Sequence, residues 1–429
     1  MPIFDDGAIR ARQRRFAEGL GADAPIVLVG AGEPIGKPGG LDQTYPFLPH
    51  PEYYWLSGAR RPGGVIAYEA GRGWFHFVRP ADEIERLWEG EPEVPPGEDV
   101  ARFNEWLRAR AGKPLAVLGN RAGAPLSALG SDPALDERVR EALDRARRPK
   151  DASEIALVER AVRATAAGFA RAREAIRPGA TERGIQIELE AEMLRQGACG
   201  FGFGTIVGAG AHAAVLHFEP GDRTVGQDDV VLIDAGAEVH EYSADVTRTF
   251  PAGRRFSSEQ QAIYDLVLAA ETEAIGRCRP GVEWHDVHRA AASVFATGLV
   301  GLGILKGSVD ALCESGAVAL FFPHGIGHML GLRVRDVGGR APGRPEGRSC
   351  CGAKVRVDLP LEEGFLMTVE PGLYFVPAIL DDAGRRLRFK DSVAWEVVER
   401  WRVVGGVRIE DDVLITAAGH AVLTSAIPK

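Results

Sequence analysis

The sequence has little sulfur, and it lacks a long hydrophobic run. Its 429 residues include five cysteines, an odd number, without the spacing of a disulfide framework or a thiolate metal site. Adjacent Cys350 and Cys351 have poor geometry for a mutual disulfide, so free thiols in a reducing compartment are expected. The weakly polar run 289–306 is too short to span a bilayer, and residues 1–16 lack the apolar core of a secretion signal. We therefore expect a cytoplasmic protein without a membrane partner.

The sequence also has fewer positively charged than negatively charged residues. The sequence has 51 Lys and Arg against 60 Asp and Glu, a formal net charge of −9. An acidic chain repels phosphate backbones, which disfavours a nucleic-acid partner. The 45% of hydrophobic and 26% of charged residues are typical of globular proteins and exclude a disordered or fibrous chain. The length predicts two or three domains.

A domain boundary is predicted near Arg145–Ser153. This stretch, RARRPKDAS, is basic, contains proline and precedes an alanine-rich helix that Asp151 or Ser153 can cap. We therefore expect a smaller α/β domain over residues 1–147 and a larger α+β domain over residues 148–429.

Acidic residues mark two predicted buried strands in the second domain. The strand 230–234 (VVLID) ends on Asp234, and the strand 244–250 (ADVTRTF) contains Asp245. If these strands form a hairpin that turns near residues 239–240, the two carboxylates pair directly on one face. Two buried like charges repel, so one pKa rises unless a cation lies between them. The pair indicates a metal, although a turn cap and a surface carboxylate are the alternative for these two residues alone.

Two histidines and two glutamates extend this set. His324 and His328 lie four residues apart in PHGIGH, where the glycines favour a loop over a helix. Glu370 precedes a Pro-Gly turn, and Glu410 lies on an alternating strand with Arg408 on the same face. Each feature alone is common. Together, two aspartates, two glutamates and one of the histidines give an oxygen-rich ligand set with one imidazole. Such a set favours Mn²⁺ or another divalent first-row ion over structural zinc, and bridging carboxylates would hold two ions.

These residues carry a resemblance to a known family. From about Arg148 onward the chain resembles the pita-bread metallopeptidases, in their aminopeptidase P and prolidase branch, and the front region resembles their creatinase-like N-terminal domain. The resemblance implies an α+β catalytic domain with a curved antiparallel sheet. The motifs that carry it are AAVLHF (213–218), VVLIDAGAEVHEYSADVTRTF (230–250), FPHGIGHMLGLRVRDVG (322–338), TVEPGLYF (368–375), GVRIEDDVLIT (407–416) and, in the front region, YPFLPHPEYYWLSG (45–58).

The resemblance also implies a role for each candidate residue. A hydroxide that bridges two divalent ions would be the nucleophile, with Mn²⁺ the expected ion and Co²⁺ or Zn²⁺ the alternatives. Glu370 would accept the proton of that water, His217 would hydrogen-bond the substrate carbonyl, and His324 would bind substrate near the scissile bond. The implied ligands are Asp234 and Asp245 for one ion, Asp245, His328 and Glu370 for the other, and Glu410 as a bridge beside Asp245.

One position departs from the family pattern. Family members usually read DVHDVG where this chain reads RVRDVG, so Arg335 replaces a histidine. A guanidinium cannot act as an acid or base here, but it can bind a carboxylate with two parallel hydrogen bonds. Arg335 is therefore expected to bind the C-terminal carboxylate of a short substrate, with Arg408 and Arg333 as further candidates.

The expected activity is hydrolysis of Xaa-Pro bonds in dipeptides or short peptides. The first alternative is a pita-bread peptidase of altered specificity, a dipeptidase or carboxypeptidase that recognises the C-terminal carboxylate. A non-catalytic peptide-binding relative is disfavoured because such relatives typically lose ligands. Methionine aminopeptidases usually lack the front domain, and creatinase needs no metal. Dimers are common in the family, so a homodimer is expected, with the aromatic stretch 45–55 either its interface or part of the core.

Overall fold

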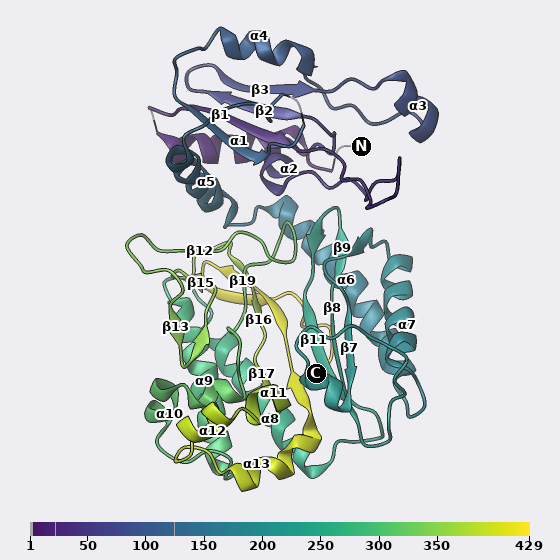
Figure 1. Cartoon of the computed structure of the whole chain (residues 1–429), viewed down its shortest axis with the longest axis vertical. Coiled ribbons are helices and arrows are strands. Elements are labelled where there is room, and N and C mark those ends of the chain that lie inside the picture. The colour runs from purple at the N-terminus through teal and green to yellow at the C-terminus, as the bar shows by residue number, and fades with distance from the viewer. Residues whose placement is uncertain (1–2, 22, 124) are drawn as a thin grey trace. The chain divides into compact units, whose positions relative to one another are not determined.

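The computed structural model describes residues 3–21, 23–123 and 125–429. The chain divides into two compact units, residues 1–147 and 148–429 (Figure 1). Among the described residues, no helix combines the length and apolar character needed to cross a membrane.

Unit 1 is built on a mixed five-stranded sheet with the order β4-β3-β2-β1-β5. The central strand β2 is antiparallel to both β1 and β3, whereas β5 is parallel to β1 and β4 is parallel to β3. The strands are β1 (Ile26–Ala31), β2 (Val65–Glu69), β3 (Gly73–Val78), β4 (Glu98–Asp99) and β5 (Leu115–Asn120). The helices are α1 (Asp6–Leu20), α2 (Pro51–Ser57), α3 (Glu83–Glu89), α4 (Phe103–Arg108) and α5 (Pro133–Arg147).

The aromatic stretch 45–55 divides into a buried and an exposed part. Tyr53, Tyr54 and Trp55 are fully buried in α2, so these three rings cannot face a second chain. Tyr45, by contrast, is 50% exposed. The end of the stretch therefore belongs to the core, and only its exposed beginning can contribute to an interface.

Unit 2 contains several small antiparallel sheets. β8 lies between β7 and β11, β9 lies between β6 and β10, β19 lies between β16 and β20, and β17 pairs with β18. These strands are β6 (Gly200–Phe201), β7 (Ile206–Ala209), β8 (Val230–Ala235), β9 (Ala237–Val239), β10 (Tyr242–Ser243), β11 (Val246–Pro251), β16 (Leu366–Val369), β17 (Gly372–Tyr374), β18 (Gly406–Arg408), β19 (Asp411–Thr416) and β20 (Gly419–Val422). Shorter strands are β12 (Gly339–Arg340), β13 (Ser349–Cys350), β14 (Ala353–Lys354) and β15 (Val357–Asp358).

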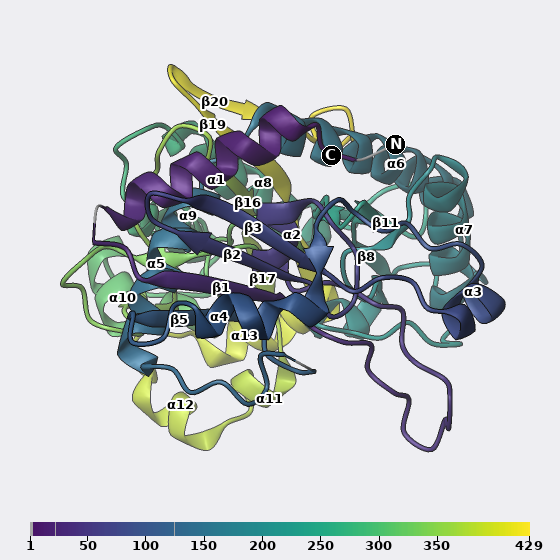
Figure 2. The same cartoon turned by 90° about the horizontal axis from the view of Figure 1, so that it is seen from above.

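Two helix pairs cover opposite sides of these strands. The pair α6 and α7 lies beside β7 and β8, and the pair α8 and α9 lies on the other side of the unit (Figure 1, Figure 2). The helices of unit 2 are α6 (Ala152–Ala175), α7 (Glu182–Arg195), α8 (Ser258–Arg277), α9 (Trp284–Gly301), α10 (Val309–Ser315), α11 (Pro377–Leu380), α12 (Ala383–Arg388) and α13 (Trp395–Trp401). The strands between the pairs are thus buried on both flanks, which is where the predicted ligands lie.

The first helix of unit 2 begins at the predicted cap. The Asp151 side chain accepts hydrogen bonds from the backbone N–H groups of Ser153 (2.9 Å) and Glu154 (3.0 Å). The Glu154 carboxylate in turn accepts from the backbone N–H of Asp151 at 3.0 Å, which completes a capping box. Two otherwise unpaired donors are satisfied, and this fixes the start of α6.

Candidate metal centre

The hairpin that carries the two aspartates differs in register from the sequence expectation. Asp234 in β8 lies opposite Thr247 in β11, so the predicted direct pairing of Asp234 with Asp245 is wrong. The turn residues are His240 and Glu241, one residue later than expected, and both have positive φ. Moving the turn by one residue shifts the pairing by two, and an even shift keeps every side chain on its face. Asp234 and Asp245 therefore still share a face, as diagonal neighbours.

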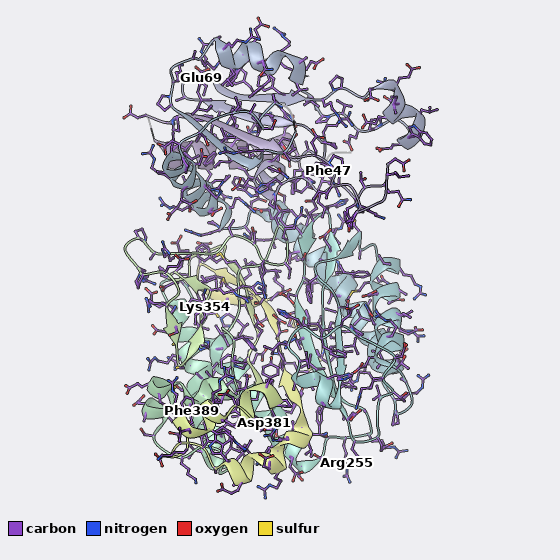
Figure 3. All side chains as sticks on the ribbon, in the orientation of Figure 1. Phe47, Glu69, Arg255, Lys354, Asp381 and Phe389 are labelled. Atoms are coloured by element: carbon purple, nitrogen blue, oxygen red, sulfur yellow. The ribbon has the colours of Figure 1, made fainter. Side chains whose placement is uncertain are left out.

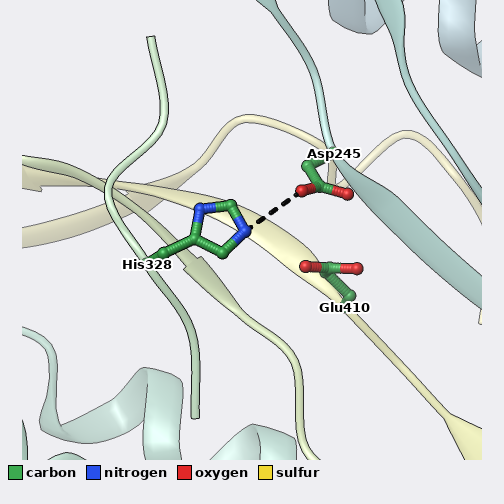
Figure 4. A group of neighbouring side chains, drawn as sticks. All are labelled: Asp245, His328 and Glu410. Carbon is green, nitrogen blue, oxygen red and sulfur yellow. Dashed lines mark ion pairs between the residues drawn. The ribbon is translucent and has the colours of Figure 1, made fainter. Parts of the chain in front are cut away.

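The predicted ligands from distant parts of the sequence meet in one pocket. Asp245, His328 and Glu410 place one potential ligand atom each within 4.8 Å of one another (Figure 4). His328 Nε2 lies 3.4 Å from Asp245 Oδ2 and 4.0 Å from Glu370 Oε1. The pocket has a volume of 770 Å³, and its lining includes all five predicted ligands, Asp234, Asp245, His328, Glu370 and Glu410.

Glu410 is held by β11, the strand that begins directly after Asp245. The backbone N–H of Glu410 donates to the Thr247 carbonyl at 3.1 Å, and the Thr247 hydroxyl donates to Glu410 Oε2 at 2.7 Å. The backbone N–H of Asp245 donates to Asp412 Oδ2 at 3.2 Å. The Glu410 carboxylate and the Asp245 backbone are therefore fixed by neighbours that are themselves buried. Thr247 could have been found from the sequence, because it lies two residues after Asp245 and so on the same face.

The loop around His328 is fixed by β16. The Thr368 hydroxyl accepts from the backbone N–H of His328 at 3.1 Å, and the Thr368 backbone N–H donates to the His328 carbonyl at 2.9 Å. At Gly327, a Cβ would lie 2.0 Å from the Thr368 carbonyl oxygen, so only glycine allows this approach. His328 Nδ1 lies 3.1 Å from the Met329 carbonyl, and donation there leaves Nε2 unprotonated and free to bind a cation.

The electrostatics of the carboxylate cluster favour a bound cation. Burial, then the charge of Asp234, raises the pKa of Asp245 well above its usual range, and burial, then the charge of Asp245, does the same to the pKa of Glu410. Burial also raises the pKa of Glu370. Within the described part of the chain, Asp234 Oδ1 is a buried acceptor without a hydrogen-bond partner. Converging carboxylates, an orphaned oxygen and one imidazole fit a divalent metal site.

Arg408 contacts a protein carboxylate. Its Nη2 lies 2.5 Å from Asp234 Oδ2, its Nε donates to the Thr247 hydroxyl at 2.9 Å, and its Nη1 donates to the Tyr374 hydroxyl at 2.9 Å. Only 3% of Arg408 is exposed. The Arg408 guanidinium therefore orients the Asp234 side chain. This contact was not predicted from the order of residues along the strand.

His324 and His217 both line the pocket. His324 Nε2 lies 2.9 Å from the Tyr374 hydroxyl, and its Nδ1 lies 2.9 Å from the Gly325 carbonyl. Burial, then the positive charge of Arg408, lowers the pKa of His324 to about 3, so its ring is neutral at physiological pH. His217 is exposed and keeps its ring accessible from the pocket. Tyr374 was missed from the sequence, although it lies within the TVEPGLYF motif.

The two arginines of the RVRDVG segment have different surroundings. Arg335 is exposed on the pocket lining, together with Lys354 and Arg356. Arg333 instead has positive φ, and its Nη1 lies 2.6 Å from Glu241 Oε2. The pocket therefore has a basic rim in which Arg335 takes part, whereas the ion pair directs Arg333 to the hairpin turn.

The neighbour of Arg335 anchors this segment. Asp336 Oδ2 lies 2.8 Å from Lys150 Nζ, and both side chains are buried. The same carboxylate accepts the backbone N–H groups of Leu332 at 3.2 Å and Val337 at 2.8 Å. The loop is thereby held at its base while the Arg335 side chain extends toward the pocket.

Comparison with protein families gives two matches. Residues 156–417 match metallopeptidase family M24, and residues 9–101 match the aminopeptidase P N-terminal domain. The probable Xaa-Pro aminopeptidase pepP of Talaromyces marneffei is 32% identical over 409 residues, covering 90% of this chain and 87% of the relative. The corresponding protein of Aspergillus fumigatus is 33% identical over 411 residues, with the same coverage.

Solved structures resemble the whole chain. The aminopeptidase PepP of Pseudomonas aeruginosa is 30% identical, with a TM-score of 0.80 over 100% of this chain and 97% of that one. Zinc-substituted aminopeptidase P of E. coli, in complex with product, is 27% identical, with a TM-score of 0.79 over 99% of this chain and 96% of that one.

Proposed function

Because the chain belongs to metallopeptidase family M24 and carries the aminopeptidase P N-terminal domain, we propose that it is a metal-dependent Xaa-Pro aminopeptidase. The predicted family and the predicted pita-bread fold are confirmed. The observation that carries the proposal is the convergence of Asp245, His328 and Glu410 in a pocket that also contains Asp234 and Glu370. The relatives named Xaa-Pro aminopeptidases support the choice of substrate.

The five acidic and imidazole ligands would hold two divalent ions. The oxygen-rich donor set supports Mn²⁺, with Co²⁺ or Zn²⁺ as alternatives. When bound, such ions act as Lewis acids and lower the pKa of a bound water toward neutrality. Glu370 would accept the proton, as the family resemblance implies, since its side chain lines the pocket and is 19% exposed there.

The neighbouring residues would position the peptide. His217 would donate a hydrogen bond to the carbonyl oxygen of the scissile bond, where a preplaced donor contributes about 2.7–4 kcal/mol. His324 would border the scissile bond as a neutral ring, because the Tyr374 hydroxyl holds its Nε2. Arg408 would keep Asp234 oriented and so acts through a ligand.

A short peptide substrate, a homodimer and a cytoplasmic location are part of the same proposal. The five cysteines are free thiols, which supports a reducing compartment. The exposed start of the aromatic stretch, with Tyr45, is the proposed interface between copies. A mass in solution equal to one chain would remove the dimer from the proposal.

A substrate panel tests the proposed activity. Purified protein loaded with Mn²⁺, Co²⁺ or Zn²⁺ in turn is assayed with Ala-Pro, Ala-Pro-Ala and Ala-Ala-Ala. We expect cleavage after the first residue only where proline follows, together with bound metal by elemental analysis. Cleavage at the C-terminal bond, or equal turnover of the peptide without proline, would favour the altered-specificity alternative. Protein without metal and without turnover would favour a peptide-binding relative.

Arg335 is expected to set the preference for short substrates. A hydrogen bond to a charged group contributes about 1.5–3 kcal/mol, so Arg335→His should lower kcat/KM for Ala-Pro about 10–100-fold. Turnover of Ala-Pro-amide, which lacks the carboxylate, should change little. Arg340→His is the matched control, since Arg340 is an exposed arginine five residues away. The same ratio of the two substrates in both variants would rule out carboxylate recognition by Arg335.

Metal removal is expected to destabilise the protein increasingly with pH. Asp245, Glu370 and Glu410 have raised pKa values in the metal-free folded chain. Below about pH 4 they are protonated in both states, whereas at higher pH only the unfolded chain ionises freely. The Tm of the metal-free protein should therefore fall between pH 5 and 8, while the metal-loaded protein is protected by neutralisation of the charges. A Tm difference between the two forms that does not grow with pH would contradict this prediction.

A further inference from the structure

A second pocket in unit 2 is lined by thiols and arginines. Its volume is 750 Å³, and three of the five cysteines line it, Cys313, Cys350 and Cys351. Arg289 is among the arginines of its lining, and Pro323 lines both this pocket and that of the metal centre. The proposed peptidase chemistry uses none of these thiols.

The fold brings the three thiols together from two segments. Cys313 lies in the last turn of α10, and Cys350 and Cys351 lie at the turn between β13 and β14. A Cβ on Gly352 would lie 2.7 Å from the Gly316 Cα, so this turn is pressed against the residue that follows α10. This close backbone approach sets Cys351 beside Cys313.

Cys351 is the centre of the cluster. Its sulfur lies 3.9 Å from that of Cys350, and Cys313 belongs to the same buried cluster and lines the same pocket. Cys350 is engaged elsewhere, since its Sγ lies 3.6 Å from the His285 carbonyl, to which it donates. Cys350 and Cys351 are adjacent in sequence, which is poor geometry for a disulfide. Cys313 and Cys351 are therefore the pair that can be joined.

The surroundings give the two partners different roles. The neighbouring Cys351 thiol lowers the pKa of the Cys313 thiol to about 7, whereas the neighbouring thiols raise the pKa of Cys351. The positive charge of Arg289, which lines the same pocket, acts on all three thiols. A thiolate is the nucleophilic form of cysteine. Cys313 thus has the character of the attacking thiol and Cys351 that of the resolving thiol.

We propose that Cys313 and Cys351 are a peroxide-reactive dithiol whose reversible disulfide lowers the activity of the metal centre. The Cys313 thiolate attacks one oxygen of hydrogen peroxide and breaks the O–O bond, giving a sulfenic acid and, after protonation, water. The Cys351 sulfur then attacks the Cys313 sulfur, its proton leaves with the sulfenic hydroxyl as a second water, and the S–S bond forms. Two thiols are oxidised and one peroxide is reduced to two waters.

The hairpin that carries Cys351 also reaches the metal pocket. Lys354, at the end of β14, and Arg356 belong to the pocket lining, and Figure 3 labels Lys354. The Lys354 carbonyl lies 3.1 Å from the position of a Cβ on Gly325, next to His324. We infer that joining Cys351 to Cys313 through an S–S bond of about 2.05 Å shifts the hairpin relative to α10. That movement would displace the basic rim and the loop that holds His324.

The test uses full-length protein loaded with zinc, which has no redox chemistry, and freed of excess metal. Thiols are counted and disulfides mapped by mass spectrometry before and after hydrogen peroxide, and Ala-Pro hydrolysis is measured on the same samples. We expect a Cys313–Cys351 disulfide and a fall of up to about 100-fold in kcat/KM, as expected for displaced catalytic groups, with recovery after a phosphine reductant, which does not bind zinc as a dithiol would. Cys313→Ser should keep its activity in peroxide, whereas the matched control Cys199→Ser, at an exposed cysteine, should behave as the unmodified chain.

Three results would overturn the proposal. They are oxidation of Cys313 without a disulfide to Cys351, a disulfide with unchanged turnover, and equal loss of activity in Cys313→Ser. The link to activity rests on the proposed function, which the untreated sample tests separately. A chain that hydrolyses no Xaa-Pro peptide before treatment fails the proposed function, while the disulfide map still decides whether the dithiol exists.

Discussion

Replacing Asp245 with asparagine should abolish peptide hydrolysis and release bound metal. Asp245 lies 3.4 Å from His328 and has a ligand atom within 4.8 Å of one on Glu410, and its carboxylate is the one that the family resemblance assigns to both ions. Loss of metal removes several kcal/mol of transition-state stabilisation, so kcat/KM should fall by about 10³-fold or more. Elemental analysis of the purified variant, beside steady-state assays of Ala-Pro, measures both effects.

The same substitution should leave the metal-free chain folded. Asparagine removes one of the charges that raise the pKa of Glu410, so the metal-free variant should be at least as stable as the metal-free unmodified chain. Asp222→Asn, at an exposed aspartate, is the control and should retain both metal and turnover. Full metal content in Asp245→Asn would exclude Asp245 as a ligand.

Replacing Arg248 with methionine should cause the largest loss of stability. Arg248 is 1% exposed, and its Nη2 lies 2.7 Å from Asp411 Oδ1, while its Nη1 donates to the Glu410 carbonyl at 2.7 Å. Removing one partner of a buried ion pair leaves the other charge uncompensated and costs about 3–5 kcal/mol. Lys429 Nζ also lies 2.6 Å from Asp411, which places the expected loss at the lower end of that range.

Urea unfolding at neutral pH measures this loss for unit 2. Arg255→Met is the matched control, because Arg255 is exposed (Figure 3), and a change within about 0.5 kcal/mol is expected there. An equal, small effect of both substitutions would show that the Arg248 network contributes little. Reduced metal affinity in Arg248→Met is also expected, since Arg248 holds the backbone of the ligand Glu410.

The candidate ligands could be predicted from the sequence because strand periodicity fixes the face of a residue. Asp234 and Asp245 share a face in any register that differs by an even number of residues, so an error in the turn position did not separate them. The contact partner of a side chain could not be predicted in this way. The single strand expected to carry both Arg408 and Glu410 is divided in the structure: Arg408 ends β18, β19 begins at Asp411, and Glu410 lies between them in an isolated bridge. The contact of Arg408 with Asp234 joins residues far apart in sequence and depends on how two sheets meet.

Positive φ values and close backbone contacts account for the other features that could not be predicted from the sequence. Arg333 stands two residues before Arg335, and alternation alone would give both the same surroundings. Its positive φ instead brings it to Glu241. The thiol cluster was equally hidden, because the end of α10 and the turn between β13 and β14 approach each other at Gly316 and Gly352. Such backbone approaches are set by tertiary packing, which no spacing in the sequence encodes.

The isolated bridge between Thr247 and Glu410 joins the two halves of unit 2. Asp234 and Asp245 come from the half with α6 and α7, whereas His328, Glu370 and Glu410 come from the half with α8 and α9. Neither half alone contains all five candidate ligands. A polypeptide cut between them would yield two inactive fragments, and bound cations would add a second link between the halves beside the Thr247–Glu410 bridge.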